Sequence, residues 1–249
     1  MSFLTSIMQR CHSWAQYVEQ PSLLKLRRCK VPIHTYRKLS QPWLQELRVA
    51  TVLDIGANVG QFALAAREAF PQATVYSFEP LPDCFEDLQR NLGGTGRCKA
   101  FNVGLGRRSG IVALERNAFT ASSSFLPMNT THKTEFPFTR DTTRVDVRIE
   151  KLDDFAHHLS IVDPMLVKID VQGYEEEVLV GGETTIRGAV AVITETSFEP
   201  LYATQPLFDQ IYRLLVSWGF AYMGSFEQVE SCRDGRPLQS DSVFMKRPP

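Results

Sequence analysis

Short apolar runs alternate with helical segments from residue 51 onward. The runs 51–55, 73–78 and 98–103 are bounded by glycine, proline or polar residues, a pattern typical of strands. The segment 60–69 lies between the first two runs, and 82–92 begins with proline and aspartate and ends before two glycines, as helices often do. This alternation predicts a parallel sheet with helices on both faces.

The same alternation resumes after residue 150. A helix is expected to open at 152–155, followed by a buried strand at 166–170, a helix at 175–180, a strand at 189–193 and a helix at 207–218. Two final strands, 220–225 and 242–246, fit an antiparallel hairpin. We therefore predict an α/β fold with one mostly parallel sheet.

Residues 107–150 interrupt this order. A short strand at 111–115 precedes a serine- and threonine-rich stretch at 120–129, and alternating apolar residues predict another strand at 145–149. We interpret the segment as an inserted hairpin or flap. Such an insertion either shapes the pocket for a substrate or is a mobile loop without ligand contact, and the sequence leaves both alternatives open.

A glycine turn follows the first predicted strand, in the sequence TVLDIGANVG at residues 51–60. Gly56 and Gly60 leave room for a ligand close to the backbone, and Asp54 supplies a carboxylate at the end of the strand. The pattern D-x-G-x-x-x-G lacks the glycine pair that admits a pyrophosphate, which argues against NAD or FAD. The alternative is an ordinary crossover whose glycines only shape the turn.

Glu79 ends the second predicted strand, about twenty residues after the first glycine, where a carboxylate can accept both ribose hydroxyls. Together with the glycine turn, it predicts a nucleoside cofactor. Asn102 ends the third strand, where its amide either reaches an adenine edge or serves as a turn residue.

Asp170 and Glu195 end two later strands at the same edge of the sheet. Two acids in a pocket repel, so that the pKa of one rises and it can act as a general base toward a hydroxyl. Lys168 precedes Asp170 on the same strand face and either holds the acid ionised, orients the acceptor, or is paired on the surface. Asp170 also has an alternative role as the cap of the helix that follows.

The composition fits one sizeable core. With 249 residues, 43% of them hydrophobic, we expect one catalytic domain at 51–249 after an N-terminal helical extension at 1–50. Aromatic residues in the extension are expected to pack, although such a segment can also cover a cofactor pocket. The net charge of -1 gives no electrostatic reason to expect a nucleic-acid partner.

The five cysteines are scattered and form no metal-binding pattern, which favours free thiols in a reducing compartment. No apolar run approaches the length of a membrane span. We therefore expect a cytoplasmic protein with no integral membrane segment.

From Val52 to roughly Lys246, the sequence resembles the FkbM-type S-adenosylmethionine-dependent methyltransferases. The resemblance is carried by several blocks in the same order: VLDIGANVGQF, YSFEPLPDCFEDL, NVGLG, SSSFL, LDDF, LVKIDVQGYEEEVLVGG, ITETSFEPLY, QPLFDQIY and LQSDSVFMK. It implies the seven-stranded Rossmann-like sheet of class I methyltransferases and O-methylation of a hydroxyl on a sugar, glycolipid or polyketide.

The resemblance also implies roles for individual residues. The methionine end of S-adenosylmethionine is assigned to Asp54, Gly56, Asn58 and Gly60, the ribose to Glu79, and the adenine to Asn102 and Val103.

One departure concerns the strand that leads to Asp170. The family often reads K-I-D-V-E-G-x-E there, and this chain has Gln172 in place of the second acid. Asp170 is therefore our candidate base, with Glu195 and Lys168 beside it. Two alternatives stay open: a magnesium-assisted O-methyltransferase using Asp170 and Glu195, and a cofactor-binding interaction module without turnover.

Overall fold

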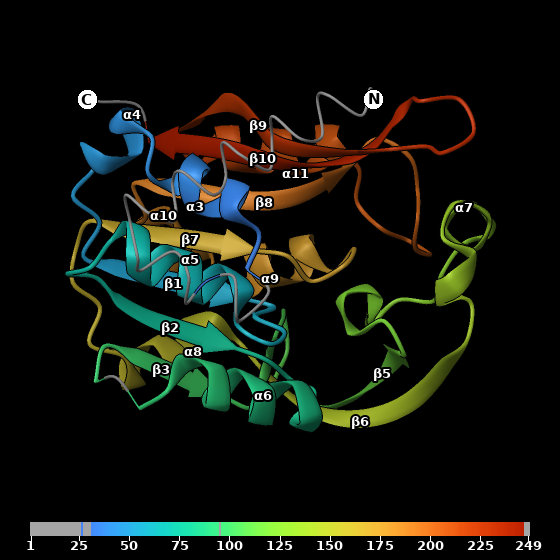
Figure 1. Cartoon of the computed structure of the whole chain (residues 1–249), viewed down its shortest axis with the longest axis horizontal. Coiled ribbons are helices and arrows are strands. Elements are labelled where there is room, and N and C mark those ends of the chain that lie inside the picture. Colours follow the sequence, from blue (N-terminus) through green and yellow to red (C-terminus); the bar gives the residue numbers. More distant parts are fainter. Residues whose placement is uncertain (1–25, 27–30, 95, 247–249) are drawn as a thin grey trace, which may run out of the picture.

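The computed structural model describes residue 26 and residues 31–94 and 96–246 (Figure 1). Most of the predicted N-terminal extension, residues 1–25 and 27–30, lies outside the described residues. The part that is described forms two short helices, α3 (Ile33–Leu39) and α4 (Pro42–Gln45).

The main sheet has seven strands in the order β3-β2-β1-β7-β8-β10-β9. Five neighbouring strands are parallel, and β10 is antiparallel to both β8 and β9. This arrangement confirms the predicted mostly parallel sheet with an antiparallel C-terminal hairpin. The strands are β1 (Thr51–Ile55), β2 (Thr74–Phe78), β3 (Cys98–Phe101), β7 (Met165–Ile169), β8 (Ala191–Ser197), β9 (Phe220–Glu230) and β10 (Pro237–Lys246).

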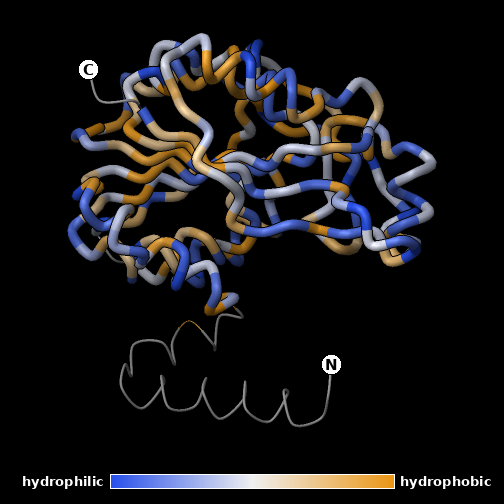
Figure 2. Tube along the Cα trace, turned by 90° about the horizontal axis from the view of Figure 1, so that it is seen from above, coloured by the Kyte–Doolittle hydropathy of each residue, from blue (hydrophilic) through white to orange (hydrophobic). Residues whose placement is uncertain are grey.

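Helices cover both faces of this sheet. Val52 and Leu53 are neighbours on β1, yet they belong to two different core clusters, because successive side chains on a strand point to opposite faces. Both clusters are apolar, which explains why the parallel strands appear in the sequence as continuous apolar runs. Figure 2 shows apolar residues concentrated in the central strands. The covering helices are α5 (Gln61–Ala69), α6 (Pro82–Leu92), α8 (Leu152–Phe155), α9 (Glu175–Gly181), α10 (Glu183–Arg187) and α11 (Phe208–Ser217).

The inserted segment forms a second, smaller sheet at the end of the main sheet toward which the parallel strands point (Figure 1). Its strands are β4 (Gly104–Leu105), β5 (Gly110–Asn117) and β6 (Thr142–Glu150), in the order β4-β6-β5. The short helix α7 (Thr130–Glu135) lies between β5 and β6 in the sequence. The predicted hairpin is thus present, with longer strands than expected.

Two details of the predicted elements are wrong. Glu195 lies inside β8 and not beyond its end, because pairing with β10 extends that strand to Ser197. Asp170 does not cap the next helix, since α9 begins at Glu175 with Tyr174 at its N-cap.

Three cysteines of the described chain, Cys84, Cys98 and Cys232, are free thiols. Among the described helices, none has the length and apolar character needed to cross a membrane.

The glycine turn after β1 is packed against the protein itself. Gly56 has φ +77°, and a Cβ there would lie 1.9 Å from the carbonyl oxygen of Asp170. Gly60 has φ +91°, and a Cβ there would lie 2.8 Å from Leu88 Cδ1 of α6. Gly56 is therefore required by close approach to the backbone of Asp170, and Gly60 by its left-handed conformation beside a Leu88 side chain that would have to move, in addition to any contact with a ligand.

This packing makes Gly56→Ala a test of the turn. Gly235→Ala is the matched control, because Gly235 has φ +76° and nothing within 4 Å of an added Cβ. The left-handed conformation costs about 1–2 kcal/mol in both variants. We expect Gly56→Ala to lose at least about 2 kcal/mol more, since the backbone of Asp170 must move. Urea unfolding measures the difference, and equal losses would contradict this account.

Candidate active site

A pocket of ≈ 210 Å³ opens at the carboxyl ends of the parallel strands. Its walls come from the glycine turn after β1, the ends of β2, β7 and β8, helix α3 and the inserted segment. The carboxyl edge of an open α/β sheet is where such folds bind their ligands.

The structure brings six of the ten predicted site residues to this pocket: Gly56, Asn58, Glu79, Lys168, Asp170 and Glu195. Asp54 and Gly60 lie behind the wall, where Asp54 is fully buried and Gly60 packs on α6. Asn102 and Val103 are not among the lining residues.

The side chain of Asn102 stabilises the turn after β2. Its Nδ2 donates to the carbonyl oxygens of Glu79, at 2.9 Å, and of Pro80, at 3.0 Å. These bonds support the turn-residue alternative for its side chain. Val103 is buried in the core. An adenine contact by either residue stays a prediction.

Glu79 joins the glycine turn to the end of β2. Its Oε2 accepts the backbone N–H of Asn58 at 2.8 Å, and its Oε1 accepts that of Leu81 at 2.9 Å. Burial raises the pKa of Glu79 to about 7, although the two N–H donors oppose the shift. Each carboxylate oxygen has a second lone pair, so that Glu79 can still accept hydrogen bonds from a diol in the pocket.

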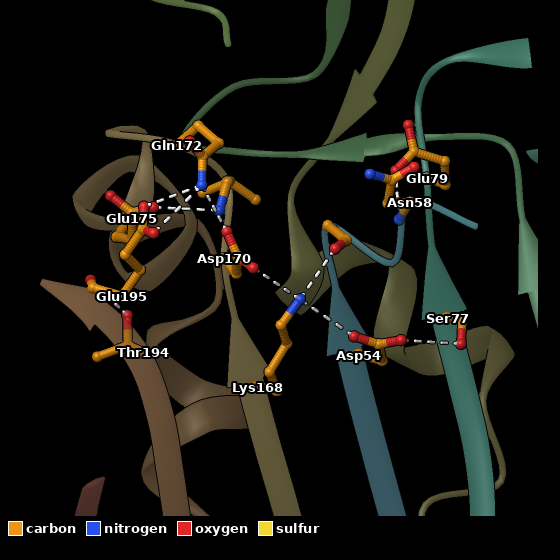
Figure 3. Close-up of polar contacts among 12 residues, drawn as sticks. Asp54, Asn58, Ser77, Glu79, Lys168, Asp170, Gln172, Glu175, Thr194 and Glu195 are labelled. Carbon is orange, nitrogen blue, oxygen red and sulfur yellow. Dashed lines mark hydrogen bonds and ion pairs between the residues drawn. The ribbon is translucent and has the colours of Figure 1, made fainter. Parts of the chain in front are cut away.

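Lys168 links the ends of β1 and β7 (Figure 3). Its Nζ lies 3.4 Å from Asp54 Oδ1 and 3.5 Å from Asp170 Oδ2, and it donates to the carbonyl oxygen of Gly56 at 2.9 Å. Only 9% of the Lys168 surface is exposed. The alternative that Lys168 is paired on the protein surface is therefore wrong. Burial opposes its charge, but Asp170 and Asp54 outweigh burial and raise the pKa of Lys168.

Glu195 is held by two glutamines. Gln172 Nε2 donates to its carboxylate at 3.1 and 3.2 Å, and Gln239 Nε2 also donates to it. Burial, together with the nearby acids Asp170 and Glu175, raises the pKa of Glu195 well above its usual value. Burial is the largest cause of this shift, and repulsion by Asp170 adds to it.

Two residues that the sequence analysis missed also belong to this edge. Gln172 was considered only as a lost acid, yet its amide bridges Asp170 and Glu195. Asp241 lies opposite Glu195 in the register of β10 and β8 and lines the pocket. The predicted strand began at Ser242, one residue after Asp241. A strand predicted from its true start at Pro237 would have included Asp241.

The inserted segment and helix α3 both contribute to the pocket. Thr120, Ser123 and Phe125 line it, and Thr120 Oγ1 donates to Asn58 Oδ1 at 3.1 Å. The inserted segment therefore forms part of the pocket wall, and its contact with a ligand stays a prediction. From the N-terminal extension, Thr35 and Lys38 reach the same pocket.

The arrangement does not favour a magnesium site. Within the described parts of the chain, no group of three or more histidine, cysteine, aspartate or glutamate residues is placed to hold a metal ion. Between Asp170 and Glu195 lies the amide nitrogen of Gln172, a hydrogen-bond donor that carries no lone pair for a cation.

Sequence and structure comparisons connect the chain to proteins of known class. Residues 54–222 match the sequence family described as the methyltransferase FkbM domain. The 2-O-methyltransferase NoeI of Sinorhizobium fredii is 29% identical over 224 residues, which cover 86% of this chain and 87% of NoeI. The hexuronic acid methyltransferase AglP of Haloferax volcanii is 32% identical over 156 residues, covering 61% of this chain and 58% of AglP. The crystal structure of methyltransferase FkbM from Methylobacillus flagellatus aligns with a TM-score of 0.49 and 15% identity, over 80% of this chain and 44% of that one.

Asp241 provides a test of the electrostatics at this edge. Burial, then Asp170, raises the pKa of Asp241 to about 7, from 3.8 in a free chain. Between these pH values the folded protein holds one more proton than the unfolded chain, so that this group makes stability fall as pH rises. We expect Asp241→Asn to reduce the loss of stability between pH 5 and pH 7 by about 1–2 kcal/mol, measured by urea unfolding. Exposed Asp146, replaced by Asn, is the control, and the same pH dependence in both variants would contradict the shift.

Proposed function

The chain belongs to the FkbM methyltransferase family, and we propose that it transfers the methyl group of S-adenosylmethionine to a hydroxyl of a sugar or a similar polyhydroxylated molecule. Family membership confirms the resemblance found in the motifs, and with it an S-adenosylmethionine-dependent methyltransferase. An interaction module without turnover is not favoured.

The residues of the pocket suit this cofactor. Gly56 presents a backbone without a side chain at the pocket wall, and the Glu79 carboxylate has lone pairs available for a ribose diol. When bound, S-adenosylmethionine supplies a methyl group on a positively charged sulfur, already activated for transfer. The protein then has to orient the acceptor hydroxyl and accept its proton.

Asp170 is our candidate for the base. The observation that carries the assignment is its exposure: its side chain is 38% exposed at the pocket, whereas Glu195 is buried and has both oxygens bonded to glutamine amides. A carboxylate oxygen of Asp170 would take the proton of the acceptor hydroxyl. Lys168, 3.5 Å away, supplies a compensating positive charge beside it.

Two observations support a sugar as acceptor. One relative is named as a 2-O-methyltransferase and another as a hexuronic acid methyltransferase. The pocket offers hydroxyl, amide and carboxylate groups, from Thr35, Ser123, Gln172 and Glu227, which suit the several hydroxyls of a sugar ring. Glycolipids and polyketides are the other acceptor classes that we propose to test.

The free thiols support a reducing compartment, and we propose the cytoplasm as the location.

The direct experiment uses the purified protein with methyl-labelled S-adenosylmethionine and a panel of neutral sugars, hexuronic acids, glycolipids and polyketides. Transfer of label to a hydroxyl, located by mass spectrometry, is the expected result. Transfer to nitrogen or carbon only would contradict the proposal.

Asp170→Asn tests the base. We expect methyl transfer to fall by about 10²- to 10⁴-fold, the range of general-base catalysis, because an amide does not accept the proton. Binding of S-adenosylmethionine, measured by calorimetry, should stay within about twofold, since the assigned cofactor contacts are elsewhere. Exposed Asp154, replaced by Asn, is the control. An unchanged rate in Asp170→Asn would rule out the assignment.

A further inference from the structure

Gln172 lies between the two acids of β7 and β8 (Figure 3). Its Nε2 donates to Asp170 Oδ1 at 2.9 Å and to the Glu195 carboxylate at 3.1 and 3.2 Å. Its backbone has φ +53°, and its carbonyl oxygen accepts the hydroxyl of Ser124 at 2.6 Å. The backbone and the side chain of this residue are therefore both held in place.

The other end of the amide faces a buried tyrosine. Tyr202, 1% exposed, donates its hydroxyl to Gln172 Oε1 at 2.9 Å. Because an amide has a donor end and an acceptor end, this bond determines which end faces the two acids. If the amide were turned, its oxygen would meet two carboxylates and its NH₂ would face Tyr202.

The Tyr202 hydroxyl also contacts the inserted segment. Its oxygen lies 3.2 Å from His132 Nε2, and His132 Nδ1 lies 3.3 Å from Thr139 Oγ1. Burial lowers the pKa of His132 to about 4, so that the ring is neutral near pH 7 and has one N–H. The Thr139 hydroxyl donates its proton to the carbonyl oxygen of Phe136 at 2.7 Å, so that it can only accept from His132. The 2.9 Å bond of the Tyr202 hydroxyl to Gln172 is shorter than its 3.2 Å contact with His132.

We propose that Gln172 is a positioning residue for the base, and that the Tyr202 hydroxyl, by donating to its Oε1, helps to fix which end of its amide faces Asp170 and Glu195. This inference rests on the proposed function, because it assigns Asp170 as the base that is positioned.

The choice of an amide matters because the surroundings are already acidic. Asp170 directly follows β7 and is faced by charged groups from the elements around it: Lys168 on β7, Asp54 on β1, Glu175 on α9, Glu195 on β8 and Asp241 on β10. The glutamate that the family often carries at position 172 would add another carboxyl, and the bridge would then require a shared proton. The amide forms the bridge without adding a charge or a titratable group of its own.

Gln172→Glu and Gln239→Glu form a matched pair for testing this role. Both replace an amide that donates to Glu195, but only Gln172 also donates to Asp170. We expect the acidic limb of the kcat–pH profile to move up by about one pH unit or more in Gln172→Glu, because Asp170 loses its proton only at higher pH. The shift should be clearly smaller in Gln239→Glu. Equal shifts, or none, would overturn the proposal.

Tyr202→Phe tests the orientation of the amide. Loss of the hydroxyl donor should lower kcat by about tenfold with unchanged binding of S-adenosylmethionine, as for one lost hydrogen bond. This variant also decides the question if Gln172→Glu does not fold, as judged by circular dichroism. A wild-type kcat in Tyr202→Phe would contradict the role of the Tyr202 hydroxyl in orienting the amide.

A measurement that needs no methyl acceptor distinguishes a failure of this proposal from a failure of the proposed function. The ¹³C carboxyl signal of Asp170, assigned with Asp170→Asn, is followed against pH in the wild type, Gln172→Glu and Gln239→Glu. An upward move of its titration in Gln172→Glu supports the bridge even if no hydroxyl is methylated, and an unmoved titration overturns it. Failure of the proposed function shows instead as wild-type protein that methylates no hydroxyl.

Discussion

The carboxyl edge of the sheet depends on the buried ammonium of Lys168. Two parallel strands end here in carboxylates, and burying such charges without a partner is costly. Lys168 lies within ion-pair distance of Asp54 and Asp170 and donates to the carbonyl oxygen of Gly56. One cation thus compensates an acid that is fully buried and an acid that is open to the pocket, and it fixes the turn between them. One placement of Lys168 thus serves a carboxylate locked inside the fold and a carboxylate open to the pocket.

The sequence was sufficient for the parallel part of the fold because local signals agree there. Strands that are covered on both faces appear as apolar runs, and helix α6 has its starting proline and its terminating glycines within the same short stretch. The antiparallel part was less predictable. The hairpin strands β9 and β10 extend well beyond the apolar residues, because they pair with each other where solvent covers one side. The predicted strand at 242–246 therefore omitted Asp241.

In the site, residues could be predicted where position along a strand decides their location. Asp170, Glu79 and Lys168 follow from the rule that ligands bind at the carboxyl edge of a parallel sheet. The partners of these residues could not be predicted, because contacts across the chain bring them together: Thr120 is 62 residues from Asn58, and Tyr202 is 70 residues from His132. The glycines show a third case, since Gly56 and Gly60 were predicted correctly as a turn, but their close approaches are to Asp170 and Leu88.

The inserted segment has a consequence for how the pocket wall can diverge among relatives. The same stretch of chain supplies pocket-lining residues, such as Ser123 and Phe125, and the buried His132 that contacts Tyr202. A change in the shape of the acceptor pocket is therefore physically linked to the network around the acids. If the insertion were exchanged between two such proteins, the pocket would gain a new wall. His132 would leave with the old insertion, and Tyr202 would lose its contact with it. Grafting a different pocket wall onto this scaffold would require the residues around Tyr202 and Gln172 to be transferred with the insertion, as one unit assembled from three distant parts of the chain.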